Sequence, residues 1–375
     1  MREEKVVVIE RLAHGGNGVG RINNKVVFVP GTVPGDRVKI CITESRGRFD
    51  RGEVLEILEP SPGRISPRCS VFGLCGGCQW QHLDYATQLR EKTAILKESL
   101  QRIGKIADVI PLPIIPSPHH WNYRQRIQLH TDAESHVGFY RSERHEVVEF
   151  NRCEIAFPRL NEHLQGLKSN GYKNFPRHFE LAVDGEEVTL FPLEEEGRFF
   201  SQVNPELNER LIETVLHFAL GRSEPAFTKK WTLVELYCGS GNFTFSLARR
   251  VGKVFAVEHS LAALQEAEKR AAHLGLTNIE FLQGSAEWGL KRFYRRKSPV
   301  DILLLDPPRQ GASEILDLII VLKPRVIVYV SCDPTTLARD VGFWSRHRYR
   351  LEEVQPLDMF PQTYHLETVV KLVRA

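Results

Sequence analysis

The sequence predicts an α/β protein in which a C-terminal doubly wound sheet follows a small β-barrel and a central α+β domain. From residue 231 onward, short apolar strand segments alternate with helical segments, as in a parallel sheet with helices on both faces. Residues 5–60 instead contain short strand patterns between glycine-rich turns, which is typical of a small all-β barrel. Between these regions, three cysteines lie within ten residues of one another.

The composition is that of an ordinary globular protein. The chain has 375 residues, of which 42% are hydrophobic and 26% charged, which excludes a disordered, coiled-coil or collagen-like protein. No uncharged apolar run reaches the roughly 18 residues that a membrane span needs, and the N-terminus shows no apolar signal region. We therefore expect a cytoplasmic protein without membrane contact. The net charge of +3 is too small to identify a nucleic-acid binder.

The three expected domains are residues 1–62, 63–205 and 206–375. The prolines of the EPSPG segment at residues 59–63 mark the first boundary. In the barrel, the strand patterns cover residues 5–10, 25–29, 37–43 and 52–58. In the central domain, leucines at helical spacing before Gly104 predict a helix over residues 85–103, and residues 121–200 are rich in strand patterns.

The C-terminal domain shows the clearest alternation of elements. We expect strands at residues 233–237, 253–258, 279–282, 301–305, 326–330 and 368–373. A helical pattern covers residues 242–250, and a second helix is capped by Ser260 and ended by Gly275. These elements predict a parallel, doubly wound sheet.

A glycine-rich turn after the first of these strands predicts a nucleotide-type pocket. Gly239 and Gly241 lie between a strand and a helix, and Glu258 ends the next strand 19 residues after Gly239. In dinucleotide-binding folds an acidic residue at this distance binds ribose hydroxyls. The third glycine of the phosphate-binding pattern is absent, which fits a ligand with ribose and adenine but no pyrophosphate, such as S-adenosylmethionine. A tight turn without a ligand is the alternative.

Three more reactive side chains fall at strand ends of the same domain. Asp306 and Cys332 each follow an apolar strand, so both are expected at the carboxyl edge, where doubly wound sheets bind ligands. A thiolate at this accessible edge is a strong nucleophile, although a buried core cysteine is the alternative. Glu367 opens the final strand and is a candidate general base, against the alternative of a solvated surface glutamate.

Four cysteines form a candidate metal site. Cys69, Cys75 and Cys78 are clustered, and Cys153 lies far downstream. Such a set in a cytosolic chain indicates metal binding rather than disulfides. Zinc and an iron–sulfur cluster both use four thiolates, and the spacing alone leaves both open.

Taken together, these motifs resemble those of the RNA uracil-C5 (5-methyluridine) methyltransferase family. The matching segments are FSQVN at residues 200–204, LYCGSGNFT at 236–244, DPPR at 306–309, SCDP at 331–334 with TLARD at 336–340, and MFPQT at 359–363 with HLET at 365–368. The cysteine pattern resembles that of the iron–sulfur members. The N-terminal barrel resembles the TRAM domain, an OB-like RNA-binding module. The resemblance covers nearly the whole chain.

The resemblance implies a class I S-adenosylmethionine-dependent methyltransferase fold and a role for each motif. Cys332 would add to C6 of uracil, and Glu367 would remove the C5 proton after methyl transfer. The residues implied for S-adenosylmethionine are Gln202, Tyr237, Asn242, Glu258, Ser285 and Asp306. Covalent addition makes C5 nucleophilic and divides one difficult step into two easier ones. The target base would have to be flipped out of its stack or presented by a loop.

The resemblance also implies the metal and the partner. It favours a [4Fe–4S] cluster on the four cysteines, with zinc as the alternative, and large-subunit (23S) rRNA as substrate over a uridine of the tRNA T-loop. We expect a monomer whose open face binds RNA. The other functions considered are a methyltransferase for a different RNA base and an RNA-binding protein without catalysis. A thiol plus a base favours uracil over amine methylation, and residues 306–311 lack the second cysteine usual in cytosine-C5 enzymes.

Overall fold

The computed structural model describes residues 3–142, 144–169, 175–193, 202–221 and 228–375. By its internal contacts, the chain divides into two compact units. Unit 1 contains Met1–Ile95, His119–Glu194 and Phe360–His365, and unit 2 contains Leu96–Pro118, Glu195–Met359 and Leu366–Ala375. In the part of the chain that the structure describes, no helix is both long enough and apolar enough to cross a membrane.

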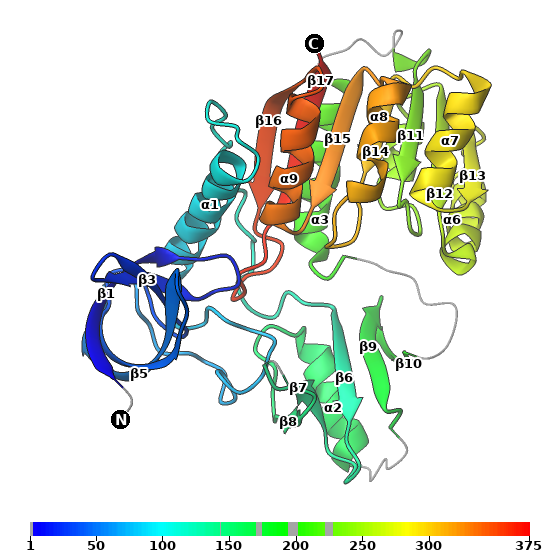
Figure 1. Ribbon diagram of the computed structural model, residues 1–375. Coiled ribbons are helices and arrows are strands. Elements are labelled where there is room, and N and C mark those ends of the chain that lie inside the picture. Colours follow the sequence, from blue (N-terminus) through cyan, green and yellow to red (C-terminus); the bar gives the residue numbers. More distant parts are fainter. Residues whose placement is uncertain (1–2, 143, 170–174, 194–201, 222–227) are drawn as a thin grey trace. The chain divides into compact units, whose positions relative to one another are not determined.

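Unit 1 begins with a closed barrel, coloured blue in Figure 1, with strand order β1-β2-β3-β5-β4. Its strands are β1 (Glu4–Leu12), β2 (Gly18–Ile22), β3 (Lys25–Val29), β4 (Arg37–Ser45) and β5 (Phe49–Glu59). Alternate side chains point inward and form an apolar core that includes Val7, Val27 and Val38. The sequence pattern does not predict β2, because its glycines mask the strand. Gly20 is required there, since a Cβ atom would lie 2.6 Å from the Val8 carbonyl oxygen.

The rest of unit 1 contains an antiparallel sheet and a helix. The sheet has the order β10-β9-β6-β7-β8. Its strands are β6 (Arg126–Thr131), β7 (Val137–Tyr140), β8 (Val147–Glu149), β9 (His178–Asp184) and β10 (Glu187–Pro192). Helix α2 (Pro158–Ser169) buries Leu160 and Leu164 in the same core as Phe179 of β9. Helix α1 (Tyr85–Arg102) ends one residue before the predicted end, and the division between the units falls within it.

Unit 2 is built on a seven-stranded sheet with the order β13-β12-β11-β14-β15-β17-β16. Its strands are β11 (Thr232–Leu236), β12 (Lys253–Glu258), β13 (Ile279–Gln283), β14 (Ile302–Leu305), β15 (Val326–Ser331), β16 (Tyr349–Leu357) and β17 (Glu367–Arg374). Strands β11 to β15 are parallel, as predicted. Strand β17 is antiparallel to both β15 and β16, a direction that the sequence pattern did not predict.

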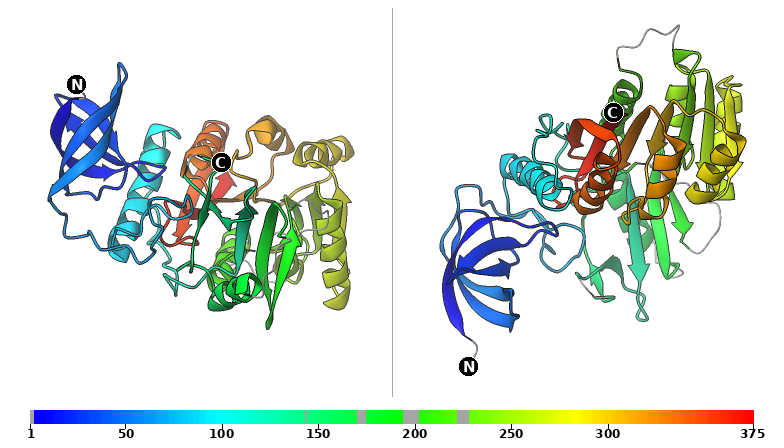
Figure 2. Two further views of the ribbon diagram at one scale, coloured as in Figure 1. Left: turned by 90° about the horizontal axis from the view of Figure 1, so that it is seen from below. Right: turned by 45° about the horizontal axis from the view of Figure 1, so that its top comes forward.

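Helices cover both faces of this sheet (Figures 1 and 2). They are α3 (Pro205–Leu220), α5 (Thr244–Ala248), α6 (Leu261–His273), α7 (Ala286–Arg296), η1 (Ser313–Ile315), α8 (Leu316–Leu322) and α9 (Pro334–Ser345). The core on the α7–α9 side contains Leu236, Leu305 and Tyr329. The doubly wound architecture is therefore confirmed. Helix α5 is shorter than the predicted helix over residues 242–250.

Candidate active site

Strand alternation brings Cys332, Glu367 and Asp306 to one place in unit 2. Ser331 of β15 pairs with Thr368 of β17 in antiparallel register, so the next residues in opposite directions, Cys332 and Glu367, face each other. Leu305 of β14 lies beside Tyr329 of β15, and both point into the α7–α9 core. By alternation, Asp306, Cys332 and Glu367 all fall on the opposite face, at the carboxyl end of the parallel strands.

The electrostatics agree with this placement. Burial, followed by the negative charge of Glu367 and a smaller effect of Asp306, raises the pKa of the Cys332 thiol to about 12 against the opposing effect of Arg309. Burial raises the pKa of Asp306 to about 7. Burial, and then the charge of Asp306, also hold the pKa of Glu367 well above its ordinary value. The site therefore disfavours negative charge, and a cation bound beside it would favour the thiolate form.

The exposure of these side chains refines the sequence prediction. Cys332 is half-buried, and Glu367 is only 4% exposed. Cys332 thus lies between the expected accessible edge and the alternative of a fully buried core cysteine, and burial favours its protonated form. The alternative of a solvated Glu367 is also excluded.

The glycine-rich turn has the backbone that its sequence requires. Tyr237, Gly239 and Gly241 have φ values of 62°, 54° and 92°. A Cβ atom at Gly241 would lie 2.5 Å from the ring of Phe245, so only glycine fits. The Gly239 amide donates a hydrogen bond of 3.0 Å to Glu258, whose other oxygen accepts from the Ser260 amide at 2.9 Å. Glu258 thus ties the turn to the end of β12.

Asn242, at the end of this turn, is held by a residue that the sequence did not single out. The side-chain amides of Asn208 and Asn242 form two reciprocal hydrogen bonds of 2.9 and 3.0 Å. Asn208 lies in the first turns of α3, whose N-cap is Asn204. No motif marks Asn208, but it follows Asn204 by one helical turn, and this spacing is the only signal in the sequence.

The remaining predicted cofactor residues lie in different surroundings. Gln202 precedes α3 and is half-buried, whereas Phe200 and Ser201 of the same motif lie outside the described residues. Ser285 is the N-cap of α7, and its hydroxyl accepts a hydrogen bond from the Trp288 amide at 3.1 Å. This capping bond is sufficient to explain a serine at this position.

A buried carboxyl beneath the turn was also missed. Glu235 lies in the middle of an apolar strand, is 1% exposed and accepts a hydrogen bond of 2.6 Å from the Thr244 hydroxyl. Burial raises its pKa to about 8, and the charge of Asp306 acts in the same direction. An acidic residue inside an apolar strand was the available signal.

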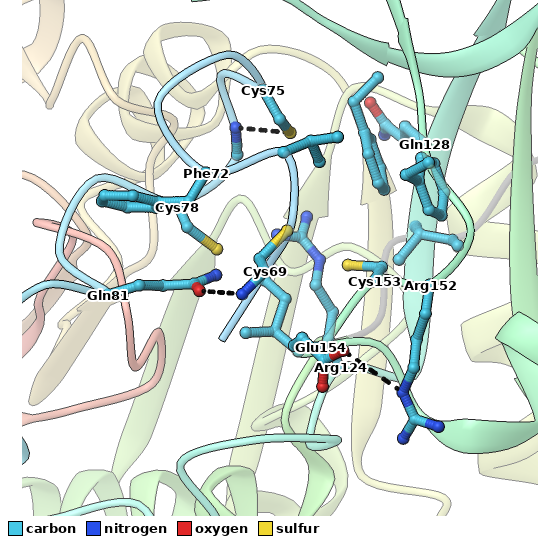
Figure 3. A pocket seen from close by; sticks show the side chains of 16 residues that line it. Cys69, Phe72, Cys75, Cys78, Gln81, Arg124, Gln128, Arg152, Cys153 and Glu154 are labelled. Atoms are coloured by element: carbon cyan, nitrogen blue, oxygen red, sulfur yellow. Dashed lines mark hydrogen bonds and ion pairs between the residues drawn. The ribbon is translucent and has the colours of Figure 1, made fainter. Parts of the chain in front are cut away.

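The four predicted metal-ligand cysteines lie together in unit 1. Cys69, Cys75, Cys78 and Cys153 line one cavity of about 140 Å³, and Figure 3 shows their side chains around a common space. Most other cavity residues are apolar, including Phe72, Phe139, Phe150 and Ile155, and the polar or charged ones are Gln81, Gln128, Arg124, Arg152 and Glu154. Burial raises the pKa of Cys75 to about 11 and that of Cys78 to about 12, and the other thiols add to both shifts.

Hydrogen bonds order the cysteine segment. The Cys69 amide donates to the side chain of Gln81 at 3.0 Å, and the Gly77 amide donates to the Cys75 sulfur at 3.3 Å. Cys153 is fixed by Asn161, whose side chain accepts from the Cys153 amide at 2.8 Å and donates to its carbonyl at 3.1 Å. The remaining cysteines, Cys41 and Cys238, are buried elsewhere.

Comparison with known proteins identifies this arrangement. Across both units, the chain is similar to a solved structure of the Pyrococcus abyssi tRNA (uracil-54, C5)-methyltransferase in complex with S-adenosyl-L-homocysteine, with a TM-score of 0.70, 24% identity and full coverage of both chains. The model of the TRAM domain matches residues 2–55, which include most of the barrel. The chain therefore has the fold of this methyltransferase structure, with an N-terminal TRAM domain.

The family follows from the sequence matches. The model described as tRNA (uracil-5-)-methyltransferase matches residues 178–375. An uncharacterized RNA methyltransferase of Thermosynechococcus vestitus is 34% identical over 97% of this chain and 96% of its own length. A Bdellovibrio bacteriovorus protein with the same description is also 34% identical, over 97% and 93%. The chain belongs to the RNA uracil-5-methyltransferase family and is an RNA methyltransferase.

Proposed function

We propose that this enzyme methylates C5 of a uracil in large-subunit rRNA, with Cys332 as nucleophile and Glu367 as base. The observation that carries the proposal is the register of β15 and β17, which sets the thiol opposite the carboxyl group with Asp306 beside them. Methylation of uracil at C5 needs a thiol to add to C6 and a base to remove the C5 proton. Few other methyl-transfer reactions need both groups.

Each step follows from the chemistry of these side chains. The Cys332 thiolate adds to C6, which moves an electron pair to C5 and O4. C5 then takes the methyl group from the sulfonium of S-adenosylmethionine, which leaves as S-adenosylhomocysteine. The Glu367 carboxylate removes the C5 proton, the C5–C6 double bond re-forms, and the C6–sulfur bond breaks to release the thiolate. Tyr237, Asn242, Glu258 and Gln202 would hold the methyl donor, with Ser285 and Asp306 as further contacts.

The cysteine cavity fits a [4Fe–4S] cluster better than a single zinc ion. Zinc–sulfur bonds of about 2.3 Å place tetrahedral ligands about 3.8 Å apart. Among the described residues, the only group of three or more possible ligands within 4.8 Å of one another is Asp132, Glu134 and His136, so no three cysteine sulfurs approach that closely. A cluster spans wider ligands and would link the cysteine segment to Cys153. Buried thiols that resist ionisation alone are deprotonated when a metal binds.

The substrate RNA has one alternative. The TRAM-type barrel together with the four cysteines supports rRNA, whereas the Pyrococcus abyssi structure supports tRNA as the second candidate. The test is methyl transfer from S-adenosylmethionine to unmodified rRNA fragments and to a tRNA transcript, with nucleoside analysis. We expect 5-methyluridine in the rRNA and none with Cys332→Ser. Product in tRNA alone would favour the second candidate, and product on another base would refute the proposed chemistry.

The metal is tested separately on anaerobically purified protein. Iron and acid-labile sulfide in equal amounts, about four of each per chain, would support the cluster. Cys153→Ser should lose both, whereas Cys41→Ser, at a cysteine outside the cavity, should retain them. Stoichiometric zinc without sulfide would contradict the proposal.

A further inference from the structure

The loop that leads to Glu367 belongs to unit 1, although both of its flanking strands belong to unit 2. The chain leaves unit 2 after Met359, forms part of unit 1 as Phe360–His365, and re-enters unit 2 at Leu366. We call Phe360–His365 the anchor loop. Glu367 begins β17 only two residues after this loop ends. Contacts that fix the anchor loop therefore also restrain the chain segment directly before Glu367.

The centre of the anchor loop is a strained residue. Gln362 has a φ of 70°, a left-handed conformation that is unusual for a residue other than glycine, asparagine or aspartate. Gln362 is also only 2% exposed. Such a conformation costs about 1–3 kcal/mol and persists only where the surroundings impose it.

Gln88 of helix α1 contributes two hydrogen bonds to that restraint. The Gln88 side chain accepts a hydrogen bond of 2.9 Å from the Gln362 amide and donates one of 3.0 Å to the Gln362 side chain. Gln88 is 1% exposed, and it also donates to the carbonyls of Trp80 and Leu83. The two glutamines thus form a buried pair in which the Gln88 side chain both accepts from the Gln362 backbone amide and donates to the Gln362 side chain, whose own amide donates to the His120 carbonyl at 3.4 Å.

The backbone of the anchor loop is bound as tightly. Three successive carbonyls, those of Phe360, Pro361 and Gln362, accept hydrogen bonds from three separate parts of unit 1. Lys92 donates to the first at 3.0 Å, and Tyr123 to the second at 3.1 Å. The amides of Gln79 and Trp80 donate to the third at 3.1 and 2.9 Å. Since Gln79 directly follows Cys78, the cysteine segment is bonded to the same loop.

We propose that Gln88 and Gln362 are positioning residues for Glu367. The register of β15 and β17 sets Glu367 opposite Cys332, and the paired side chains impose the left-handed turn on the anchor loop, which restrains the chain segment that leads into Glu367. This inference rests on the proposed function, because it assigns Glu367 the removal of the C5 proton. A loop needed only for stability would not require a strained, buried glutamine that closes a pair with another glutamine.

The proposal predicts a specific kinetic defect. If Glu367 is misplaced, Cys332 can still add to C6 and C5 can still accept the methyl group. The C5 proton then stays in place, the C5–C6 double bond does not re-form, and the C6–sulfur bond does not break. The enzyme is held as a covalent adduct with methylated RNA, which survives denaturation in detergent. Loss of folding would reduce addition and elimination alike and would leave no adduct.

The experiment compares four variants under single-turnover conditions with saturating RNA. Gln88→Ala and Gln362→Gly test the pair, and the glycine variant relieves the strain while keeping the backbone bonds, so it should fold. Glu367→Gln is the reference for trapped adduct. Gln165→Ala, in helix α2 of the same unit, is the matched control. We expect Gln88→Ala and Gln362→Gly to release 5-methyluridine about 10- to 100-fold more slowly and to accumulate adduct.

The outcomes separate the two proposals. If the wild-type enzyme makes no 5-methyluridine, or Glu367→Gln traps no adduct in an active background, the proposed function or its base is wrong. If Glu367→Gln traps adduct but neither glutamine variant does, the positioning role is refuted. A Gln362→Gly enzyme with wild-type rate would also refute it, because the side-chain pair would then be dispensable. Equal adduct with Gln165→Ala would show that the effect is not specific to the pair.

Discussion

Replacing Glu235 by glutamine should stabilise the folded protein by an amount that grows with pH. Glu235 is 1% exposed, and burial raises its pKa to about 8 from an ordinary value of 4.5. Glutamine has nearly the same shape, and its side-chain oxygen can still accept the hydrogen bond from the Thr244 hydroxyl. The substitution therefore removes the ionisable group and leaves the packing in place.

The magnitude follows from proton linkage. Between pH 4.5 and 8 the folded chain keeps a proton on Glu235 that the unfolded chain has released. The free energy of unfolding therefore falls as pH rises, by up to about 1.4 kcal/mol per pH unit. Below this window both states are protonated, and above it the loss is complete. Glu235→Gln escapes this loss, so its advantage should be small at pH 5 and about 3–5 kcal/mol at pH 8.

The assay is urea unfolding of both proteins at pH 5, 6, 7 and 8. Asp306 and Glu367 titrate in both proteins, so their contributions largely cancel in the difference. Glu287→Gln on helix α7, where the glutamate is exposed and paired with Lys291, is the control for loss of one carboxylate. A difference between Glu235→Gln and wild type that does not change with pH would refute the reasoning, since the carboxyl group would then not be held protonated by the fold.

Two further predictions concern the active site. Asn208→Ala should weaken binding of S-adenosylhomocysteine about 10-fold, as measured by calorimetry. The reason is that Asn242 loses its two hydrogen bonds of 2.9 and 3.0 Å to Asn208, each worth about 1 kcal/mol. Unchanged affinity would exclude a positioning role for Asn208. Cys332 should react with iodoacetamide at pH 8 about 1000-fold more slowly than a thiol with the ordinary pKa of 9.0. Glu367→Gln should accelerate this reaction, because it removes a negative charge beside the thiol. Peptide mass mapping measures both rates, and an unchanged rate in Glu367→Gln would contradict the electrostatic account.

The sequence was sufficient to predict that Asp306 and Cys332 lie at one edge of the sheet, because that placement depends only on strand ends. Asp306 and Cys332 each follow an uninterrupted apolar run, and the carboxyl ends of neighbouring parallel strands lie together. The direction of β17 was not predictable, since an apolar run is the same whether its strand is parallel or antiparallel to its neighbour. The antiparallel pairing supports the proposed function, because it sets the first residue of β17, Glu367, opposite Cys332.

What the sequence did not predict depends on long-range pairing. Asn208 and Gln88 have no local pattern that marks them, since their partners, Asn242 and Gln362, lie 34 and 274 residues away. The conformation of Gln362 could not be inferred either, because glutamine has no preference for positive φ and the strain is imposed by contacts. Only side-chain hydrogen bonds in the folded chain reveal such residues.

The charges around Cys332 give a physical reason for expecting the thiol to react only when the methyl donor is bound. Burial and two neighbouring acids raise the pKa of the Cys332 thiol to about 12, so very little thiolate exists at neutral pH. A sulfonium carries one positive charge into the same low-dielectric region, where its attraction for a thiolate is much larger than in water. S-adenosylmethionine should therefore increase the iodoacetamide reactivity of Cys332 relative to S-adenosylhomocysteine, which has nearly the same shape without the charge. Equal reactivity with the two ligands would show that the charge of the donor does not activate the thiol, and RNA binding would then have to do so.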